Sequence, residues 1–480
     1  MTREDRSLEI SPEDLRRLIT DAGERIIAHI ESLPRQPAAV TEGGAALARS
    51  LAEPMPERGR PWPELLELLF EKVIPASFNT AGPGYLAYIP GGGLPQTAVA
   101  DLISAATNRY VGVFAAAPGL AQIEANVVRW FCDMAGYPSS SGGILTTGGS
   151  LSNLSALVTA RRERLPRNFL DGVIYASDQT HHSVQKAAQL AGFPEENVRE
   201  IPTDAEFRMR IEALAAQVAA DRAAGLQPCL VVGNAGTTNT GAVDDLIALA
   251  DLAARERLWF HVDAAYGGFF LLTDRGRARL AGIERSDSIT LDPHKGLFLP
   301  YGTGSLLVRD GEALRRAHAL SADYMPTMQE DADLVDFNLI SPELSRGWRG
   351  LRVWLPMQMH GAGPFRQNLE EKLDLAEWAA GELRQIDGME ILAEPQLSIV
   401  AFQLRPPGAG EAELDAINRD LMRRINARGR VYLTGTTLRG RFAIRICVLS
   451  FRTHRDRMEM GVEDVRRSVA ELSADPRPAP

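Results

Sequence analysis

Apolar residues follow two different spacings in the middle of the chain. Between residues 83 and 360, short continuous apolar runs alternate with segments whose apolar residues recur at helical spacing. The runs are GGILTT, GVIYAS, CLVVGNA, LWFHVDA, SITLD and GSLLVR. A continuous apolar run is typical of a strand buried on both faces, and helical connections between such strands favour parallel order. The pattern predicts an α/β doubly wound domain with a mostly parallel central sheet and helices on both faces.

The two ends of the chain have other patterns. Ser11 and Pro12 are typical of a helix start, apolar residues then recur at helical spacing as far as Ile30, and LLELLFEKVI predicts a second helix. Two such helices cannot form a core alone, so we expect them to pack on the main body or on a partner subunit. Beyond residue 371, EILAEPQLSIVAFQLRP, RVYLTGTTLRG and FAIRICVLS alternate like half-exposed strands between helices. The predicted division is an N-terminal helical arm (1–80), a large α/β domain (81–370) and a small α+β domain (371–480).

Composition and charge exclude several classes of function. The net charge of −10 argues against a nucleic-acid surface, which needs clustered basic side chains. No window reaches about 18 uninterrupted apolar residues, and MTREDRSLEI lacks the apolar core of a secretory signal, so we expect no membrane span and no export. The three cysteines are scattered in apolar contexts without metal-ligand spacing. We therefore expect buried, reduced thiols, a cytoplasmic location and no metal site.

Two predicted strands end in residues that could hold a planar phosphorylated ligand. In open parallel sheets, ligands bind at the carboxyl ends of the strands. GGILTT is followed by Gly148, Gly149 and Ser150 and then by a helix, which suits a phosphate, although a plain Ser-capped helix explains the segment equally well. GVIYAS is followed by His181 and His182, either of which could stack on a flat ring or be an ordinary histidine.

Three further predicted strands also end in polar residues that could contact such a ligand. Thr238 lies in the turn after CLVVGNA, where a simple Thr-rich turn is an adequate reading. Asp263 ends an apolar strand, where a lone carboxylate is costly unless a cation meets it, and small residues follow it. Lys295 follows SITLD and could form an imine if its pKa is lowered. Together, a phosphate cradle, a stacking histidine, a buried aspartate and an imine-forming lysine describe pyridoxal 5′-phosphate, a phosphorylated cationic ring that carries an aldehyde.

With these motifs the chain resembles the group II pyridoxal-phosphate-dependent decarboxylases of fold type I, close to the aromatic-L-amino-acid decarboxylases. The resemblance rests on GYLAYIPGG, GGSLSNLSAL, SDQTHHSV, GTTNTGAVDD, HVDAAYGG, DPHKG and SRGWRGLRVW, and it covers nearly the whole chain. HVDAAYGG followed by DPHK is highly specific for the family. The resemblance implies an aspartate aminotransferase-like fold, decarboxylation of an L-amino acid to its amine and CO₂, and a homodimer.

The resemblance also implies roles for individual residues. Lys295 would hold the cofactor as a Schiff base, with His294, Gly149 and Ser150 near the phosphate. The residues implied to surround the pyridine ring are His181 and Ala265 on its faces, Asp263 at its nitrogen and Thr238 at its polar edge. Tyr324 falls where the family has a catalytic tyrosine on a mobile loop, and Tyr88, Ile89 and Tyr301 fall on segments that line the substrate side-chain pocket.

Three departures from the family pattern put an aromatic substrate in doubt. Gly296 stands where many members have a bulky residue, Ile89 where aromatic-specific members commonly have Phe, and Asp292 where some animal members have Asn. Aminotransfer, and oxidative decarboxylation with deamination to an aldehyde, stay open as alternative reactions. A non-catalytic role is disfavoured because Lys295 and Asp263 are both present.

Overall fold

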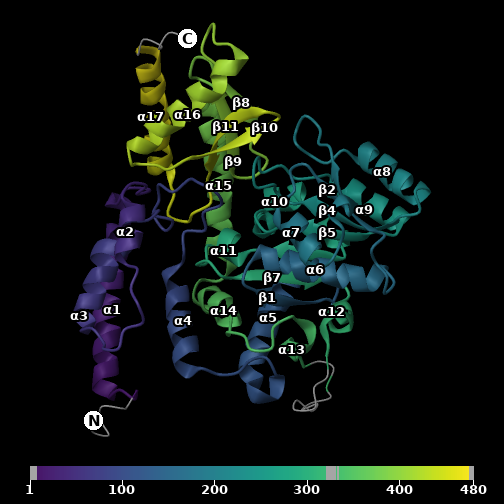
Figure 1. Ribbon diagram of the computed structural model, residues 1–480, viewed down its shortest axis with the longest axis horizontal. Coiled ribbons are helices and arrows are strands. Elements are labelled where there is room, and N and C mark those ends of the chain that lie inside the picture. The colour runs from purple at the N-terminus through teal and green to yellow at the C-terminus, as the bar shows by residue number, and fades with distance from the viewer. Residues whose placement is uncertain (1–7, 321–330, 332–333, 475–480) are drawn as a thin grey trace.

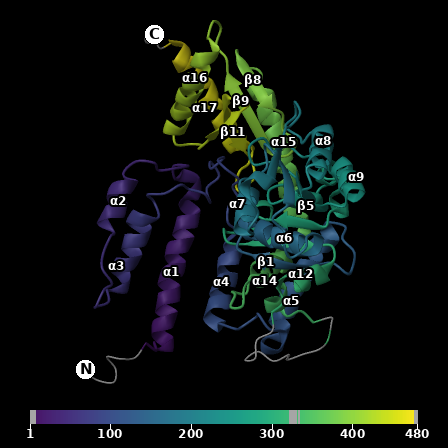
Figure 2. The same ribbon diagram turned by 45° about the vertical axis from the view of Figure 1, so that its right-hand side comes forward.

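A helical arm precedes the main body of the protein. The computed structural model describes residues 8–320, 331 and 334–474. The arm contains α1 (Pro12–Ser32), α2 (Gly44–Ser50) and α3 (Trp62–Glu67), and α3 continues as a π-helical turn over Leu68–Val73. The predicted cap is confirmed, since the Ser11 side chain accepts a hydrogen bond from the Asp14 N–H at 3.0 Å. Both views place the arm at one side of the body (Figures 1 and 2).

A seven-stranded sheet lies at the centre of the body, in the order β1-β7-β6-β5-β4-β2-β3. Its strands are β1 (Gly142–Thr146), β2 (Gly172–Ser177), β3 (Val198–Ile201), β4 (Gln227–Asn234), β5 (Trp259–Asp263), β6 (Ser288–Leu291) and β7 (Gly304–Val308). The strands from β6 through β5, β4 and β2 to β3 are parallel, whereas β7 is antiparallel to both of its neighbours. The six apolar runs of the sequence are all strands, and only β3 escaped the pattern.

Helices cover both faces of this sheet. Val231 and Val262 pack into one cluster with residues of α5, α8 and α9, while their neighbours Leu230 and Val232 pack into another with residues of α6, α7 and α12. The helices of the body are α4 (Pro95–Thr107), α5 (Pro118–Met134), α6 (Gly149–Arg164), α7 (Ser183–Leu190), α8 (Ile211–Ala223), α9 (Leu246–Glu256), α10 (Asp274–Arg279), α11 (Pro293–Gly296), α12 (Gly311–His318), α13 (Phe337–Ile340) and α14 (Gly350–His360). No helix within the described ranges is long and apolar enough to cross a membrane.

The C-terminal part contains a second, antiparallel sheet in the order β10-β11-β9-β8. Its elements are α15 (Ala362–Leu383), β8 (Met389–Ala393), β9 (Ile399–Leu404), α16 (Glu411–Ala427), β10 (Thr434–Leu438), β11 (Arg441–Cys447) and α17 (Arg455–Ala474). The predicted boundary between the large and the small domain, at residue 370, lies within α15 and stays a prediction.

The expectation of half-exposed strands is wrong for the two central strands of this sheet. β9 is buried throughout, and so is β11 after its first residue. Val400 and Phe402 pack in the same cluster as residues of α15, α16 and α17. Ala401 lies in another cluster with Phe207 and Ala242 of the large domain. One face of the sheet therefore meets helices and the other meets the large domain, which the alternation of residues could not reveal.

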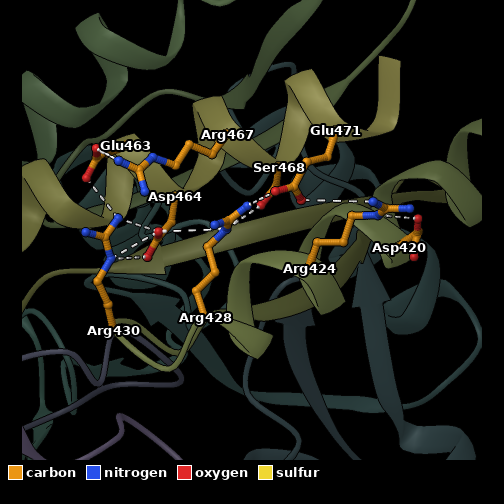
Figure 3. A network of polar contacts seen from close by, with 9 residues as sticks. All are labelled: Asp420, Arg424, Arg428, Arg430, Glu463, Asp464, Arg467, Ser468 and Glu471. Carbon is orange, nitrogen blue, oxygen red and sulfur yellow. Dashed lines mark hydrogen bonds and ion pairs between the residues drawn. The ribbon is translucent and has the colours of Figure 1, made fainter. Parts of the chain in front are cut away.

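A polar network holds α17 against the rest of the C-terminal part (Figure 3). Asp464 of α17 is fully buried and accepts hydrogen bonds from Arg430, which follows α16. Arg428 forms an ion pair with Asp464 at 3.9 Å. Arg424 forms an ion pair with Asp420 at 2.9 Å, where the side chains are more exposed than Asp464. The network joins α17 to α16 and to the segment that leads into β10.

Candidate active site

A cavity of about 280 Å³ lies at the carboxyl ends of the parallel strands. Polar segments that follow β1, β2, β4, β5 and β6 all contribute to its wall. The predicted cofactor-binding residues that line it are Gly149, Ser150, His181, Thr238, Asp263, Ala265, His294 and Lys295. Residues up to 146 positions apart in the sequence, from Gly149 to Lys295, are thus brought to one site.

The segment after β1 approaches the cavity closely. Here α6 begins at Gly149, and the first N–H groups of a helix have no partner within the helix. A side chain at Gly149 would place its Cβ 3.1 Å from an oxygen of Asp292, so glycine keeps this wall open. Free N–H groups beside the Ser150 hydroxyl form a suitable site for an anion.

Lys295 is paired with an aspartate that the sequence analysis had noted only as a departure. Lys295 Nζ lies 2.9 Å from Asp292 Oδ2. Burial disfavours the ammonium form, but the charges of Asp292 and Asp263 outweigh it, and the pKa of Lys295 is raised. The surroundings of Lys295 therefore favour its ammonium form, whereas imine formation needs the neutral amine. The other oxygen of Asp292, Oδ1, is buried and has no hydrogen-bond partner among the described residues.

Asp263 and His181 are held in place by hydrogen bonds. Asp263 accepts from the Ala265 N–H at 3.1 Å and from Asn153 Nδ2 at 3.0 Å. The charge of Asp263 attracts that of Lys295, although the two form no direct ion pair among the described residues. His181 Nδ1 lies 2.8 Å from Ser183 Oγ and accepts from the Ser183 N–H at 3.2 Å. Burial lowers the pKa of His181 and so favours a neutral ring, although the charge of Asp263 acts in the opposite direction.

His294 and Thr238 are tied to the body by backbone contacts. His294 Nδ1 donates to the Thr303 carbonyl at 2.7 Å, which leaves Nε2 to face the cavity side, 3.7 Å from Asp292 Oδ2. The carbonyl of Thr238 accepts from the guanidinium of Arg445 on β11. The small C-terminal sheet therefore helps to position the turn that carries Thr238.

The predicted substrate residues lie outside the wall of this cavity. Tyr88 is 55% exposed and has a positive φ of 50°, and Tyr301 is 59% exposed with its ring centroid 5.8 Å from that of His294. Ile89 is 7% exposed and belongs to the main core cluster. Tyr324 lies outside the described residues.

Sequence reasoning missed Asn153 and the pairing role of Asp292. Asn153 lies on α6, contacts Asp263 and lines the cavity. The available signal was the polar character of α6, where Ser152, Asn153, Ser155 and Thr159 are all buried. Buried polar side chains of this kind need partners, and here one of those partners is in the site.

Comparison with known proteins identifies the family. Residues 45–405 match the model of the pyridoxal-dependent decarboxylase conserved domain. The chain belongs to this family. It is 35% identical to an aromatic-L-amino-acid decarboxylase of Bacillus atrophaeus, over 97% of this chain and 98% of that protein.

Solved structures agree with this assignment. The structure of an Oryza sativa tryptophan decarboxylase with pyridoxal phosphate and tryptamine matches 97% of this chain and 99% of its own, with a TM-score of 0.92 at 28% identity. A 4-hydroxyphenylacetaldehyde synthase of Rhodiola rosea matches 96% of this chain and 99% of its own, with a TM-score of 0.89 at 25% identity. The fold is the α/β fold of the pyridoxal-phosphate decarboxylases, as predicted.

The cavity fits pyridoxal 5′-phosphate by the chemistry of its walls. The helix N-terminus at Gly149 suits a phosphate, Asp263 is a buried anion in need of a cation, and Lys295 supplies an amine. The unpartnered oxygen of Asp292 shows that the wall has further hydrogen-bonding capacity. The protein is therefore a carboxy-lyase that uses pyridoxal phosphate to decarboxylate an L-amino acid.

Proposed function

We propose that the substrate is an aromatic L-amino acid, which the protein converts to its amine and CO₂. The observation that supports the reaction most directly is the meeting of Lys295, Asp292, Asp263 and His181 in one cavity. The aromatic preference is supported by Tyr301, whose ring lies beside that of His294, and by Tyr88, whose carbonyl accepts from the same guanidinium of Arg445 as that of Thr238. The 35% identity to an aromatic-L-amino-acid decarboxylase supports it as well.

We assign the cofactor contacts to residues of the cavity wall. Lys295 would bond the aldehyde carbon, Gly149, Ser150 and His294 would hold the phosphate, and His181 and Ala265 would lie against the ring. When bound, pyridoxal phosphate supplies an electron-accepting ring for the electron pair left on the substrate Cα as CO₂ departs. Asp263 would keep a proton on the ring nitrogen, because a carboxylate beside a basic nitrogen favours its cationic form.

We place the substrate side chain near Tyr88 and Tyr301. Their exposure leaves both rings available to an aromatic group, and rings that meet edge-to-face or offset gain about 0.5–1.5 kcal/mol per pair. Ile89 is packed in the core, so we expect it to act by shaping the segment that carries Tyr88 rather than by touching the substrate.

Release of CO₂ from a panel of amino acids tests this proposal. We expect release from tryptophan, tyrosine, phenylalanine or their hydroxylated forms, with less from aspartate, glutamate and aliphatic amino acids. Lys295→Ala should abolish both turnover and the cofactor adduct on residue 295 that borohydride reduction traps. Preferred release from an acidic amino acid would overturn the aromatic assignment, and normal turnover by Lys295→Ala would overturn the assignment of the lysine.

A second candidate reaction is oxidative decarboxylation with deamination, which yields an aldehyde, CO₂, ammonia and hydrogen peroxide from the amino acid, dioxygen and water. The likeness to the Rhodiola rosea aldehyde synthase favours keeping it. Tyr324 would decide between the two reactions as the proton donor to Cα. Amine and aldehyde yields measured under air distinguish them.

We further propose a homodimer with the active site close to the subunit boundary. None of the residues of α1 is buried, and Leu15, Ile19 and Ile26 of its apolar stripe are between 43% and 47% exposed. An apolar stripe of this kind is stabilised by a partner surface. Light scattering should give twice the 52.3 kDa of one chain, and Ile19→Glu should weaken the dimer. A folded, active monomer at micromolar concentration would contradict the proposal.

We also propose a cytoplasmic location. Cys132, Cys229 and Cys447 are free and buried, which suits a reducing compartment. Fractionation of the native cells would test the location, and recovery outside the cytoplasm would refute it.

A further inference from the structure

Asn153 is the centre of a hydrogen-bond chain that links the protein core to the cavity. Its amide nitrogen donates to Asp263 Oδ2 at 3.0 Å and to Ser183 Oγ at 2.9 Å. Its amide oxygen accepts from Thr290 Oγ1 at 2.7 Å and lies 3.1 Å from His261 Nε2. The side chain is 1% exposed, so all four contacts are shielded from water.

The polarity of this chain follows from its chemistry. Ionised Asp263 has no proton to donate, so Asn153 must turn its NH₂ group toward the carboxylate and its oxygen toward Thr290 and His261. Burial lowers the pKa of His261 to about 4, so its ring is neutral. Because the Asn153 amide oxygen can only accept, the single proton of the ring is assigned to Nε2, which faces that oxygen. His261 Nδ1 can then accept from Ser288 Oγ at 2.8 Å, and Ser288 in turn accepts from the indole N–H of Trp259 at 2.8 Å. Every donor in the chain therefore has an acceptor.

The same amide reaches the second group that faces the cofactor. By accepting from Asn153, Ser183 Oγ leaves its own proton for His181 Nδ1, 2.8 Å away. His181 then keeps its proton on Nε2. One side chain thus orients both the carboxylate and the imidazole of the cavity wall.

We propose that Asn153 is a positioning residue that holds Asp263 as a fixed hydrogen-bond acceptor toward the cofactor ring and, through Ser183, orients His181. This inference rests on the role of Asp263 in the proposed function. Asn153 then matters for the direction of its hydrogen bonds and not only for the space that its side chain fills.

Two substitutions separate polarity from packing. Asn153→Asp keeps the shape of the side chain but places a carboxylate against Asp263, whereas Asn153→Ala removes the amide and leaves space. If polarity matters, Asn153→Asp is the more damaging change near pH 8. We expect kcat to fall by about 10- to 100-fold in Asn153→Ala, as for a lost hydrogen bond to a charged group, and by more in Asn153→Asp, with KM changed less than about threefold in both.

The pH dependence of Asn153→Asp is a second signature. Two adjacent carboxylates raise the pKa of one of them, so below that pKa the pair shares a proton and its hydrogen bond returns. The melting temperature of the cofactor-free variant, relative to the native protein, should therefore fall as the pH rises from about 5 to about 8. The titratable groups facing this pair, His181, His261, Lys295 and Asp292, are the same in both proteins, so the difference isolates residue 153.

Ser155→Ala is the matched control. Ser155 lies on the same helix, is equally buried and has a hydroxyl with no hydrogen-bond partner in the described part of the chain, so its loss should leave kcat unchanged. Thr290→Val removes one donor to Asn153 at constant shape and should lower kcat several-fold even if the Asn153 variants fail to fold. A milder effect of Asn153→Asp than of Asn153→Ala, with no pH dependence, would overturn the proposal. Failure of the native protein to release CO₂ would instead refute the proposed function, while the melting experiment would still report on Asn153.

Discussion

Replacing Asp292 by Asn should make the protein take up its cofactor faster at neutral pH. Lys295 must lose its proton before its nitrogen can attack the cofactor aldehyde. Asp292 opposes that loss, because unit charges 2.9 Å apart attract by about 6 kcal/mol at an effective dielectric constant of about 20. Desolvation of the ammonium offsets several kcal/mol of this attraction. Lys295 stays buried in Asp292→Asn, so the variant keeps this desolvation and loses the attraction, and a loss of as little as about 1.4 kcal/mol makes the neutral amine about tenfold more abundant.

Two quantities follow for the rate of cofactor uptake. The pKa of Lys295 is raised, so the neutral amine increases as the pH rises toward that pKa, and the rate in the native protein should climb about tenfold per pH unit above neutrality. Asp292→Asn should be at least about tenfold faster at pH 7. Mixing cofactor-free protein with pyridoxal phosphate and following the visible absorption of the bound cofactor measures both. Asp310→Asn, at the exposed cap of α12, is the control.

The opposite result would refute this reasoning. If Asp292→Asn slows uptake at pH 7, Asp292 acts as the base that removes the proton rather than as the anion that retains it. A rate in the native protein that does not change with pH would show that deprotonation of Lys295 does not limit uptake.

Three further predictions concern Asp263, Tyr324 and Asp464. In Asp263→Asn, the new NH₂ group must face one of the two donors that Asp263 accepts from, and the charge beside the ring is lost. We expect kcat to fall more than about 100-fold while most of the cofactor is retained, which kinetics and cofactor content will measure. Near-native turnover with bound cofactor would contradict the role of Asp263. Tyr324→Phe should give less amine and more aldehyde, ammonia and peroxide under air, whereas unchanged amine with no oxygen uptake would assign the proton donor elsewhere. Asp464→Ala should lower the free energy of unfolding, measured with urea, by about 1–3 kcal/mol, because it removes the buried carboxylate that pairs with Arg430 (Figure 3). Asp420→Ala is the more exposed control, and an equal loss there would show that the burial of Asp464 adds nothing.

The sequence by itself determined the core of the large domain and the strand ends that form the wall of the cavity. A strand buried on both faces is mostly apolar, so six of the seven central strands stood out, and β3, with Arg199 and Glu200 in only four residues, did not. Because ligands bind at the carboxyl ends of such strands, the polar residues after them marked the cavity wall from Gly149 to Lys295. These inferences need only local pattern and chain order.

Tertiary structure decided which side chains meet. The sequence treated Asp292 only as a departure from a family pattern, but folding sets it 2.9 Å from Lys295, where its charge raises the pKa of the lysine. Asn153 and Asp263 are separated by 110 positions, and β9 is buried because helices cover one face of its sheet and the large domain covers the other. Charge interactions and burial depend on distance in space, and no local pattern along the chain contains that distance.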